Sequence, residues 1–283
     1  MVGFVRHLLP RGVKVGHLGT LDPGACGVLP VAAGWATRTI QYFPPHGKAY
    51  RAEIRFGTAT DTDDAHGRVI KTCEAPSLTS AALQECCRRF LGRIEQVPPR
   101  VSALHVDGRR AYHLSREGAE FELAPREVCF HRITVLSCEK GRALIDVECG
   151  PGAYIRALAR DIGTALGSCA HLSFLLRTRS GPFGLSESCA VEDLRARGLE
   201  PFLLPVASVL KEALGRQAFV EGRSFQGGQE FAQVWDEEGR SCSLAGGSEP
   251  WPVFERSGGR FIGVGTAVRR KGRTVLRLER LLV

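Results

Sequence analysis

The stretch GHLGTLDPGACGVLP, residues 16–30, places a single carboxylate, Asp22, among glycine, proline and apolar residues, with His17 five positions earlier. A carboxylate is ionised at neutral pH without assistance and can act as a nucleophile, a general base or a metal ligand. Aspartate is also common in turns, so Asp22 can instead cap the turn at Pro23 and Gly24. His17 is compatible with a proton-carrying role or with a satisfied loop histidine.

Length and composition narrow the class of protein. The chain has 283 residues, of which 43% are hydrophobic and 24% charged, so it is long enough for one large or two ordinary domains. Its net charge of +8 favours a polyanionic partner such as nucleic acid or an anionic membrane surface. Neither a secretory signal nor an apolar run of membrane-spanning length is found, and we expect a cytoplasmic protein.

The 10 cysteines are scattered and none is spaced as C-x-x-C. This distribution indicates neither a zinc site nor a redox motif. We therefore expect reduced cysteines that are mostly buried as small hydrophobic side chains.

Several segments have a clear periodicity. Apolar residues alternate with charged ones over 48–57, which predicts a half-buried strand. Helical spacing predicts helices at the start of the chain up to Pro10, over about 80–91 with Thr79 or Ser80 as the cap, and after the Gly-Pro-Gly turn at 150–152. Residues 127–139 and 142–150 predict a hairpin, and the Gly-separated segments after about 205 predict a small β module.

Other residues carry candidate chemistry. Tyr50 is on the apolar face of its strand, where it can be a core residue or a ring stacked on a base. Arg156 follows a turn next to Tyr154, where it can pair with Asp22 or lie on a solvated helix face. The segment 98–118 carries Arg109 and Arg110 beside an aromatic residue, a composition suited to RNA phosphates and unstacked bases or to a plain surface loop with a short helical tail.

Together these motifs resemble one family. GHLGTLDPGACGVLPV resembles the G-H-x-G-x-L-D-P-x-A-x-G-x-L-P signature of TruB-type pseudouridine synthases. KAYRAEIRFGTATDTDDAHG, PPRVSALHVDGRRAYHLSREG, GAYIRALARDIG and AHLSFLLRTRSGPF are similar to four further blocks of that family, in the same order along the chain. The resemblance runs from Gly16 to about Phe183.

The resemblance implies an isomerase that converts the uridine at position 55 in the T loop of tRNA to pseudouridine. No redox cofactor and no metal are implied. Asp22 then corresponds to the catalytic aspartate, acting as nucleophile or base while the glycosidic bond breaks. Tyr50 corresponds to the tyrosine stacked on the uracil, and Arg156 to the arginine paired with the aspartate. Flipping the base out is needed because a stacked atom cannot be reached.

The remaining site residues follow from the same resemblance. Tyr154 and Leu175 match residues that line the base pocket, and His17 matches the histidine that enters the T loop. Arg109 and Arg110 are expected to bind the RNA. Two positions differ from the family pattern: His105 replaces a lysine, which implies a weaker phosphate contact, and Ala153 replaces a threonine.

The resemblance also implies the architecture. We expect an α+β pseudouridine synthase fold with a mixed, mainly antiparallel central sheet over residues 1–210, including an RNA-binding insertion at about 98–125. A small β-rich, PUA-like RNA-binding module is expected over 211–283. The family has a strand and a Lys-Pro-x-Gly segment upstream of the first helix; we expect a start codon placed too late to explain why it is not seen here.

The expected partner is the T-arm of tRNA, with no membrane, no obligatory protein partner and a monomeric state. Two other functions remain open from the residues. One is a non-catalytic tRNA-binding or RNA-folding protein. The other is a metal-dependent phosphodiesterase that uses Asp61, Asp63 and Asp64.

Overall fold

The computed structural model describes all residues except 44, 103, 107–108, 112–120, 223, 245–246 and 283, and the side chains of 105–106, 109–110, 247–248 and 280–281 are also outside its description. The chain forms two compact units. One comprises Thr20–Leu29 and Pro45–Ser188, and the other comprises Met1–Gly19, Pro30–Pro44 and Cys189–Val283. We refer to them as the sheet unit and the terminal unit.

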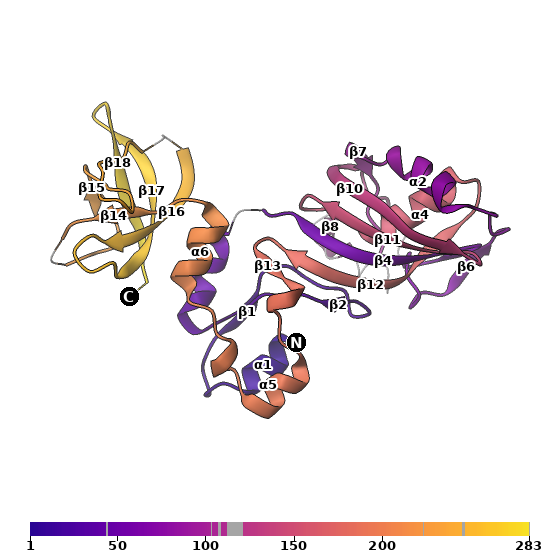
Figure 1. Ribbon diagram of the computed structural model, residues 1–283, viewed down its shortest axis with the longest axis horizontal. Coiled ribbons are helices and arrows are strands. Elements are labelled where there is room, and N and C mark those ends of the chain that lie inside the picture. Colours follow the sequence, from indigo (N-terminus) through magenta and orange to yellow (C-terminus); the bar gives the residue numbers. More distant parts are fainter. Residues whose placement is uncertain are drawn as a thin grey trace. The chain divides into compact units, whose positions relative to one another are not determined.

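A seven-stranded sheet is the centre of the sheet unit (Figure 1). Its strands run in the order β13, β12, β4, β11, β10, β7, and β2 pairs with β12. All neighbours are antiparallel except β2 and β12, which are parallel. The bounds are β2 Cys26–Gly27, β4 Lys48–Phe56, β7 Gly92–Gln96, β10 Arg126–Glu139, β11 Arg142–Cys149, β12 Ala170–Ser180 and β13 Phe183–Gly184. The mixed, mainly antiparallel sheet expected from the sequence is confirmed.

Two helices cover one face of this sheet: α2, Ser80–Arg88, and α4, Ile155–Ala165. Thr79 caps α2 because its hydroxyl accepts the amide of Ala82 at 3.2 Å. Leu83 and Leu158 bury fully against Ile54 and Ile145 of the strands. The opposite face carries cross-strand ion pairs such as Arg51 with Asp146.

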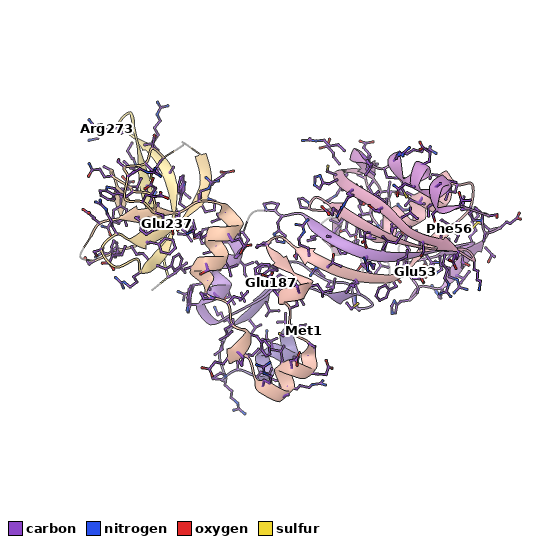
Figure 2. The ribbon with its side chains drawn as sticks, in the orientation of Figure 1. Met1, Glu53, Phe56, Glu187, Glu237 and Arg273 are labelled. Atoms are coloured by element: carbon purple, nitrogen blue, oxygen red, sulfur yellow. A yellow bond between two sulfur atoms is a disulfide. The ribbon has the colours of Figure 1, made fainter. Side chains whose placement is uncertain are left out.

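Alternation along β4 decides which side chains reach the core. Tyr50, Ala52, Ile54 and Phe56 are buried, and the residues between them are charged. Glu53 and Phe56, labelled in Figure 2, therefore belong to opposite faces of the strand. This strand pairs with both β11 and β12, so its apolar face lies in the middle of the layer.

Smaller elements complete the sheet unit. Strands β5, Thr58–Thr60, and β6, Val69–Thr72, form a hairpin, and η2, Leu185–Glu187, follows β13. His105–Val106, β8, pairs with Arg109–Arg110, β9. The prediction of a surface loop with a helical tail at 98–118 is therefore wrong at this short ladder, because adjacent polar residues paired as strands without an alternating signal. Much of the remainder lies outside the described residues.

The terminal unit contains a five-stranded sheet in the order β14, β16, β17, β18, β15, which confirms the β-rich C-terminal module. Its strands are β14 Ala218–Val220, β15 Glu230–Phe231, β16 Gly247–Glu255, β17 Phe261–Arg270 and β18 Arg273–Leu281. Leu210 of α6, Val206–Leu214, packs on Val264 and Leu282 of this module. The unit also holds α1 Val2–His7, β1 Val15–His17, β3 Val31–Ala33, η1 Gly34–Tyr42, α5 Val191–Arg197 and η3 Glu200–Phe202.

No described helix combines the length and the hydropathy needed to cross a membrane.

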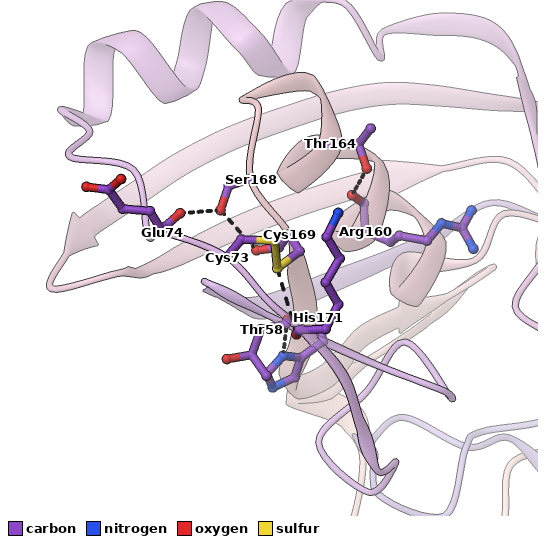
Figure 3. The surroundings of a disulfide bond; sticks show 9 residues. Thr58, Cys73, Glu74, Arg160, Thr164, Ser168, Cys169 and His171 are labelled. Carbon is purple, nitrogen blue, oxygen red and sulfur yellow. Dashed lines mark hydrogen bonds between the residues drawn. A yellow bond between two sulfur atoms is a disulfide. The ribbon is translucent and has the colours of Figure 1, made fainter.

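One disulfide joins Cys73, directly after β6, to Cys169, directly before β12 (Figure 3). The expectation that all cysteines are reduced is therefore wrong for this pair. The two residues are separated by 96 positions, and only the fold brings them together. The other eight cysteines are free.

Candidate active site

Asp22 lies in the loop between residues 20 and 29, where chain conformation is set by the Asp-Pro-Gly-Ala turn. The main-chain carbonyl of Asp22 accepts the amide of Ala25 at 2.9 Å, which closes the turn. The carboxylate is therefore available for another partner, and its side chain is 39% exposed. Proline and glycine at the two central positions favour this geometry.

The partner of the Asp22 carboxylate is Arg156, near the start of α4. Its Nε is 2.9 Å from Asp22 Oδ2, and the Arg156 side chain is only 6% exposed. The Nε–H does not reach hydrogen-bonding geometry, so the contact is an ion pair by distance. A buried cation beside a half-exposed carboxylate keeps that oxygen charged and accessible at the same time. The arrangement agrees with the pair that the sequence predicted.

Arg156 is itself held by the segment 61–64 at the end of β5. Its Nη1 donates to the carbonyl of Thr62 at 3.0 Å and lies 3.7 Å from Asp64 Oδ2. Asp64 Oδ1 in turn accepts the Thr62 hydroxyl at 2.7 Å and the His66 amide at 2.9 Å. Asp64 is thus a second anion on the same guanidinium, and the sequence analysis did not connect it to Asp22.

The other acids of this segment face separate partners. Asp63 accepts from Arg160 Nη1 at 2.7 Å, and Asp61 accepts the amide of Arg68 at 2.8 Å. Burial raises the pKa of Asp63, against the opposing charge of Arg160. Within the described residues, no three acidic, histidine or cysteine side chains converge as they would around a metal ion. The phosphodiesterase alternative therefore has no ligand cluster to build on in that part of the chain.

Tyr50 lies on β4, in register with Arg177 of β12. The Tyr50 side chain is buried, and burial raises its phenol pKa to about 12, with nearby Cys149 adding to the effect. A hydrogen bond and the charge of Arg177 act in the opposite direction. The phenol is therefore neutral at any working pH and presents a planar apolar ring with one polar atom.

Tyr154 precedes α4 and is fixed through its backbone. Its amide donates to Gln96 Oε1 at 2.9 Å, and its carbonyl accepts from Gln96 Nε2 at 3.2 Å. Gln96 is 2% exposed at the end of β7, so this double bond is shielded from water. Burial raises the pKa of the Tyr154 phenol, which also experiences the charges of Arg156 and Asp22.

The sheet unit therefore brings together Asp22, Arg156, Tyr50 and Tyr154, with Leu175 buried on β12 in the same core. His17 is exposed at the end of β1 in the terminal unit, opposite Val31. The structure does not place it with this group.

The two arginines expected to bind RNA lie on a short strand. Arg109 and Arg110 form β9, whose side chains are outside the described part. Their contact with RNA stays a prediction.

Sequence reasoning missed Gln96 and Arg177. Gln96 ends the run GRIEQ before two prolines, and a glutamine placed to pair with a backbone has no periodic signal. Arg177 falls in the strand β12 within the leucine-arginine block, where the sequence indicated only a closing turn. A buried arginine inside an apolar run was the available signal, because such residues are rarely fully buried without specific partners.

Comparison with known proteins identifies the class of this fold and site. Residues 6–155 match a family model described as "TruB family pseudouridylate synthase (N terminal domain)". Residues 156–211 match "tRNA pseudouridylate synthase B C-terminal domain". The class is that of the pseudouridylate synthases.

Relatives of known name agree over most of the chain. A protein of Symbiobacterium thermophilum named tRNA pseudouridine synthase B is 50% identical over 214 residues, covering 74% of this chain and 70% of its own length. A protein of the same name from Gloeobacter violaceus is 42% identical over 261 residues, covering 85% of this chain and 89% of its own length. The chain belongs to the TruB family of pseudouridylate synthases.

Solved structures support the fold alone. A structure titled "Crystal Structure of a Cbf5-Nop10-Gar1 Complex" aligns with a TM-score of 0.70 at 23% identity, covering 100% of this chain and 80% of that one. This agreement in shape at low identity confirms the architecture expected from the sequence.

Proposed function

We propose that this protein isomerises uridine to pseudouridine at position 55 in the T loop of tRNA. The observation that carries the proposal is the Asp22 carboxylate, two-fifths exposed and paired with the buried Arg156. Relatives at 42–50% identity carry the name tRNA pseudouridine synthase B. The net charge of +8 suits a polyanionic substrate.

Asp22 acts as the nucleophile, or as the base that leads to a glycal, while the bond between uracil N1 and ribose C1′ breaks. The detached uracil turns, a bond forms between its C5 and C1′, and the C5 proton leaves as N1 gains one. Atoms therefore balance, and no electron or phosphoryl group is exchanged with a second molecule. Arg156 keeps the carboxylate charged and oriented throughout.

The flipped uracil is held between buried side chains. Tyr50 offers a neutral ring for stacking, and Tyr154 and Leu175 line the same pocket. Stacking on an aromatic face contributes on the order of 1–3 kcal/mol per base, which offsets part of the unstacking cost. His17, Arg109 and Arg110 are proposed to contact the RNA outside this pocket.

The chain is proposed to contain a catalytic domain over 1–210 and a PUA-like RNA-binding module over 211–283. It is proposed to act in the cytoplasm as a monomer on the T-arm of tRNA, without an obligatory protein partner. The name shared by its relatives includes no partner protein.

Release of tritium from tRNA that carries 5-tritiated uridine tests this function, because the C5 hydrogen leaves only when the isomerisation occurs. We expect the wild type to release tritium with or without EDTA, and Asp22→Ala to release none. Asp146→Ala is the matched control, since it removes a carboxylate paired with Arg51 on the other face of the sheet. Tritium retained by a wild type that still binds tRNA would favour the non-catalytic tRNA-binding alternative.

A further inference from the structure

Arg177 is completely buried in β12, and its side chain reaches the loop that carries Asp22. Its Nε donates to the Val28 carbonyl at 2.7 Å, and its Nη1 donates to the Thr20 carbonyl at 3.0 Å. Thr20 precedes Asp22 and Val28 follows it. One guanidinium therefore ties both flanks of the segment that presents the carboxylate.

The backbone of Arg177 holds the same loop a second time. The Val28 amide donates to the Arg177 carbonyl at 2.8 Å, in the parallel pairing of β2 with β12. Gly27 is the register partner of Arg177 and has a φ of +102°. A Cβ on Gly27 would lie 2.8 Å from the Arg177 amide nitrogen, so the approach is closer than any side chain allows.

The third contact of Arg177 is with the tyrosine of the site. Tyr50 is its register partner on β4, and the Arg177 guanidinium hydrogen-bonds the phenol. Burying a guanidinium costs free energy that only well-directed acceptors offset. Here acceptors come from the Asp22 loop and from Tyr50, which are separate parts of the chain.

We propose that Arg177 is a positioning residue for the isomerisation: its guanidinium holds the Asp22 loop through Thr20 and Val28 and fixes the Tyr50 phenol, so that carboxylate and ring meet one base in a set geometry. The inference rests on the proposed function. A planar guanidinium supplies several donors at fixed angles, which an ammonium does not reproduce. Misplacement of a reacting group by about 1 Å can cost about 100-fold in rate.

Kinetics of Arg177→Gln and Arg177→Lys test this role. We expect Arg177→Gln to lower kcat for tritium release by about 100-fold, with Arg177→Lys between it and the wild type. The KM for tRNA should stay within about threefold, because Arg177 does not touch the RNA. Arg179→Gln is the control on the same strand, where a half-exposed arginine lies 3.6 Å from Glu148, and its kcat should match the wild type.

Hydrogen exchange separates local positioning from general destabilisation. Peptides covering residues 20–29 should exchange faster in Arg177→Gln than in the wild type, while those covering β10 and β11 should be unchanged. The proposal is overturned if kcat matches the Arg179→Gln control. It is also overturned if exchange accelerates equally everywhere and tRNA binding falls in step with kcat.

A double-mutant cycle tests the phenol contact. In a Tyr50→Phe background, Arg177→Gln should lower kcat by less than it does in the wild type, because one of its contacts is already gone. Full additivity would overturn that part of the proposal. Should the wild type release no tritium, the proposed function fails, and the exchange comparison alone decides whether Arg177 holds the loop.

Discussion

The guanidinium of Arg156 lies 2.9 Å from the carboxylate of Asp22, and the arginine is almost fully buried while the carboxylate is two-fifths exposed. The same guanidinium donates to the Thr62 carbonyl and lies near Asp64. This geometry depends on the fork of an arginine, because three acceptors approach from different directions. A single ammonium would keep the charge but lose the geometry.

Arg156→Lys should therefore lower the single-turnover rate of tritium release by about 100-fold or more, a magnitude typical for removing one preorganised electrostatic contact. The reason is loss of orientation of the Asp22 carboxylate. Arg51→Lys is the matched control, since Arg51 forms an exposed pair with Asp146, and such pairs contribute little. An Arg156→Lys variant as fast as that control would contradict the role of the pair.

Two glycines in the Asp22 loop should respond differently to alanine. Gly27 has a positive φ and its Cβ would collide with the backbone of Arg177, which cannot move without breaking the sheet. Gly27→Ala should lower the free energy of unfolding by about 2 kcal/mol or more and abolish most activity. Urea unfolding followed by circular dichroism measures the first effect.

Gly24→Ala is the paired variant in the same loop. Its Cβ would meet the imidazole of His66, a side chain that is 71% exposed and free to rotate away. The cost should be below about 1 kcal/mol, as for most surface substitutions. Equal destabilisation by the two variants would show that close approach to Arg177 is not what requires glycine at position 27.

Periodicity predicted the elements with one apolar face. The strand expected at 48–57 is β4, Lys48–Phe56, and the helix expected after Thr79 is α2. These elements form where local pattern and burial agree. The strand β12 was not predicted, because its buried Arg177 and half-exposed Phe174 interrupt any alternation.

The site was predictable to the extent that its residues belong to sequence motifs. Asp22 and Arg156 were expected to pair, and they do. Gln96 and Arg177 act through backbone carbonyls and amides, and such partners leave no mark on the sequence. The disulfide was missed for a related reason: a separation of 96 residues carries no spacing signal.

The disulfide between Cys73 and Cys169 should stabilise the sheet unit. Closing a loop of 96 residues restricts the unfolded chain, and a cross-link of this kind contributes roughly 2–5 kcal/mol. The Cys73→Ser/Cys169→Ser double variant should lower the urea midpoint accordingly. Cys189→Ser, which removes a free thiol, is the control.

Thiol counting gives an independent check of the pairing. The denatured wild type should react with a thiol reagent at eight cysteines without reductant and at all 10 after reduction. Ten reactive thiols before reduction would show that the bond is not formed in the purified protein.

Stability should fall steeply in alkali because buried groups hold their protons in the folded state. Burial raises the pKa of Tyr50, Cys87 and Cys149 to about 12, from ordinary values of 10.0 for the phenol and 9.0 for the thiols. Above the unfolded pKa the unfolded chain loses these protons while the folded chain keeps them. The stabilisation is therefore complete below about pH 9 and is lost as the pH rises toward about 12.

Cys87→Ala isolates one of these groups, since the Cys87 thiol is fully buried against the core. Between about pH 9 and 12, the free energy of unfolding should fall less steeply in the variant, by up to about 1.4 kcal/mol per pH unit, the value for one proton. Urea unfolding at several pH values measures it, in reducing buffer so that disulfide exchange does not vary. Cys26→Ala, which removes an exposed thiol, should leave the slope unchanged; the same slope in Cys87→Ala and the wild type would mean that the Cys87 proton is not retained on folding.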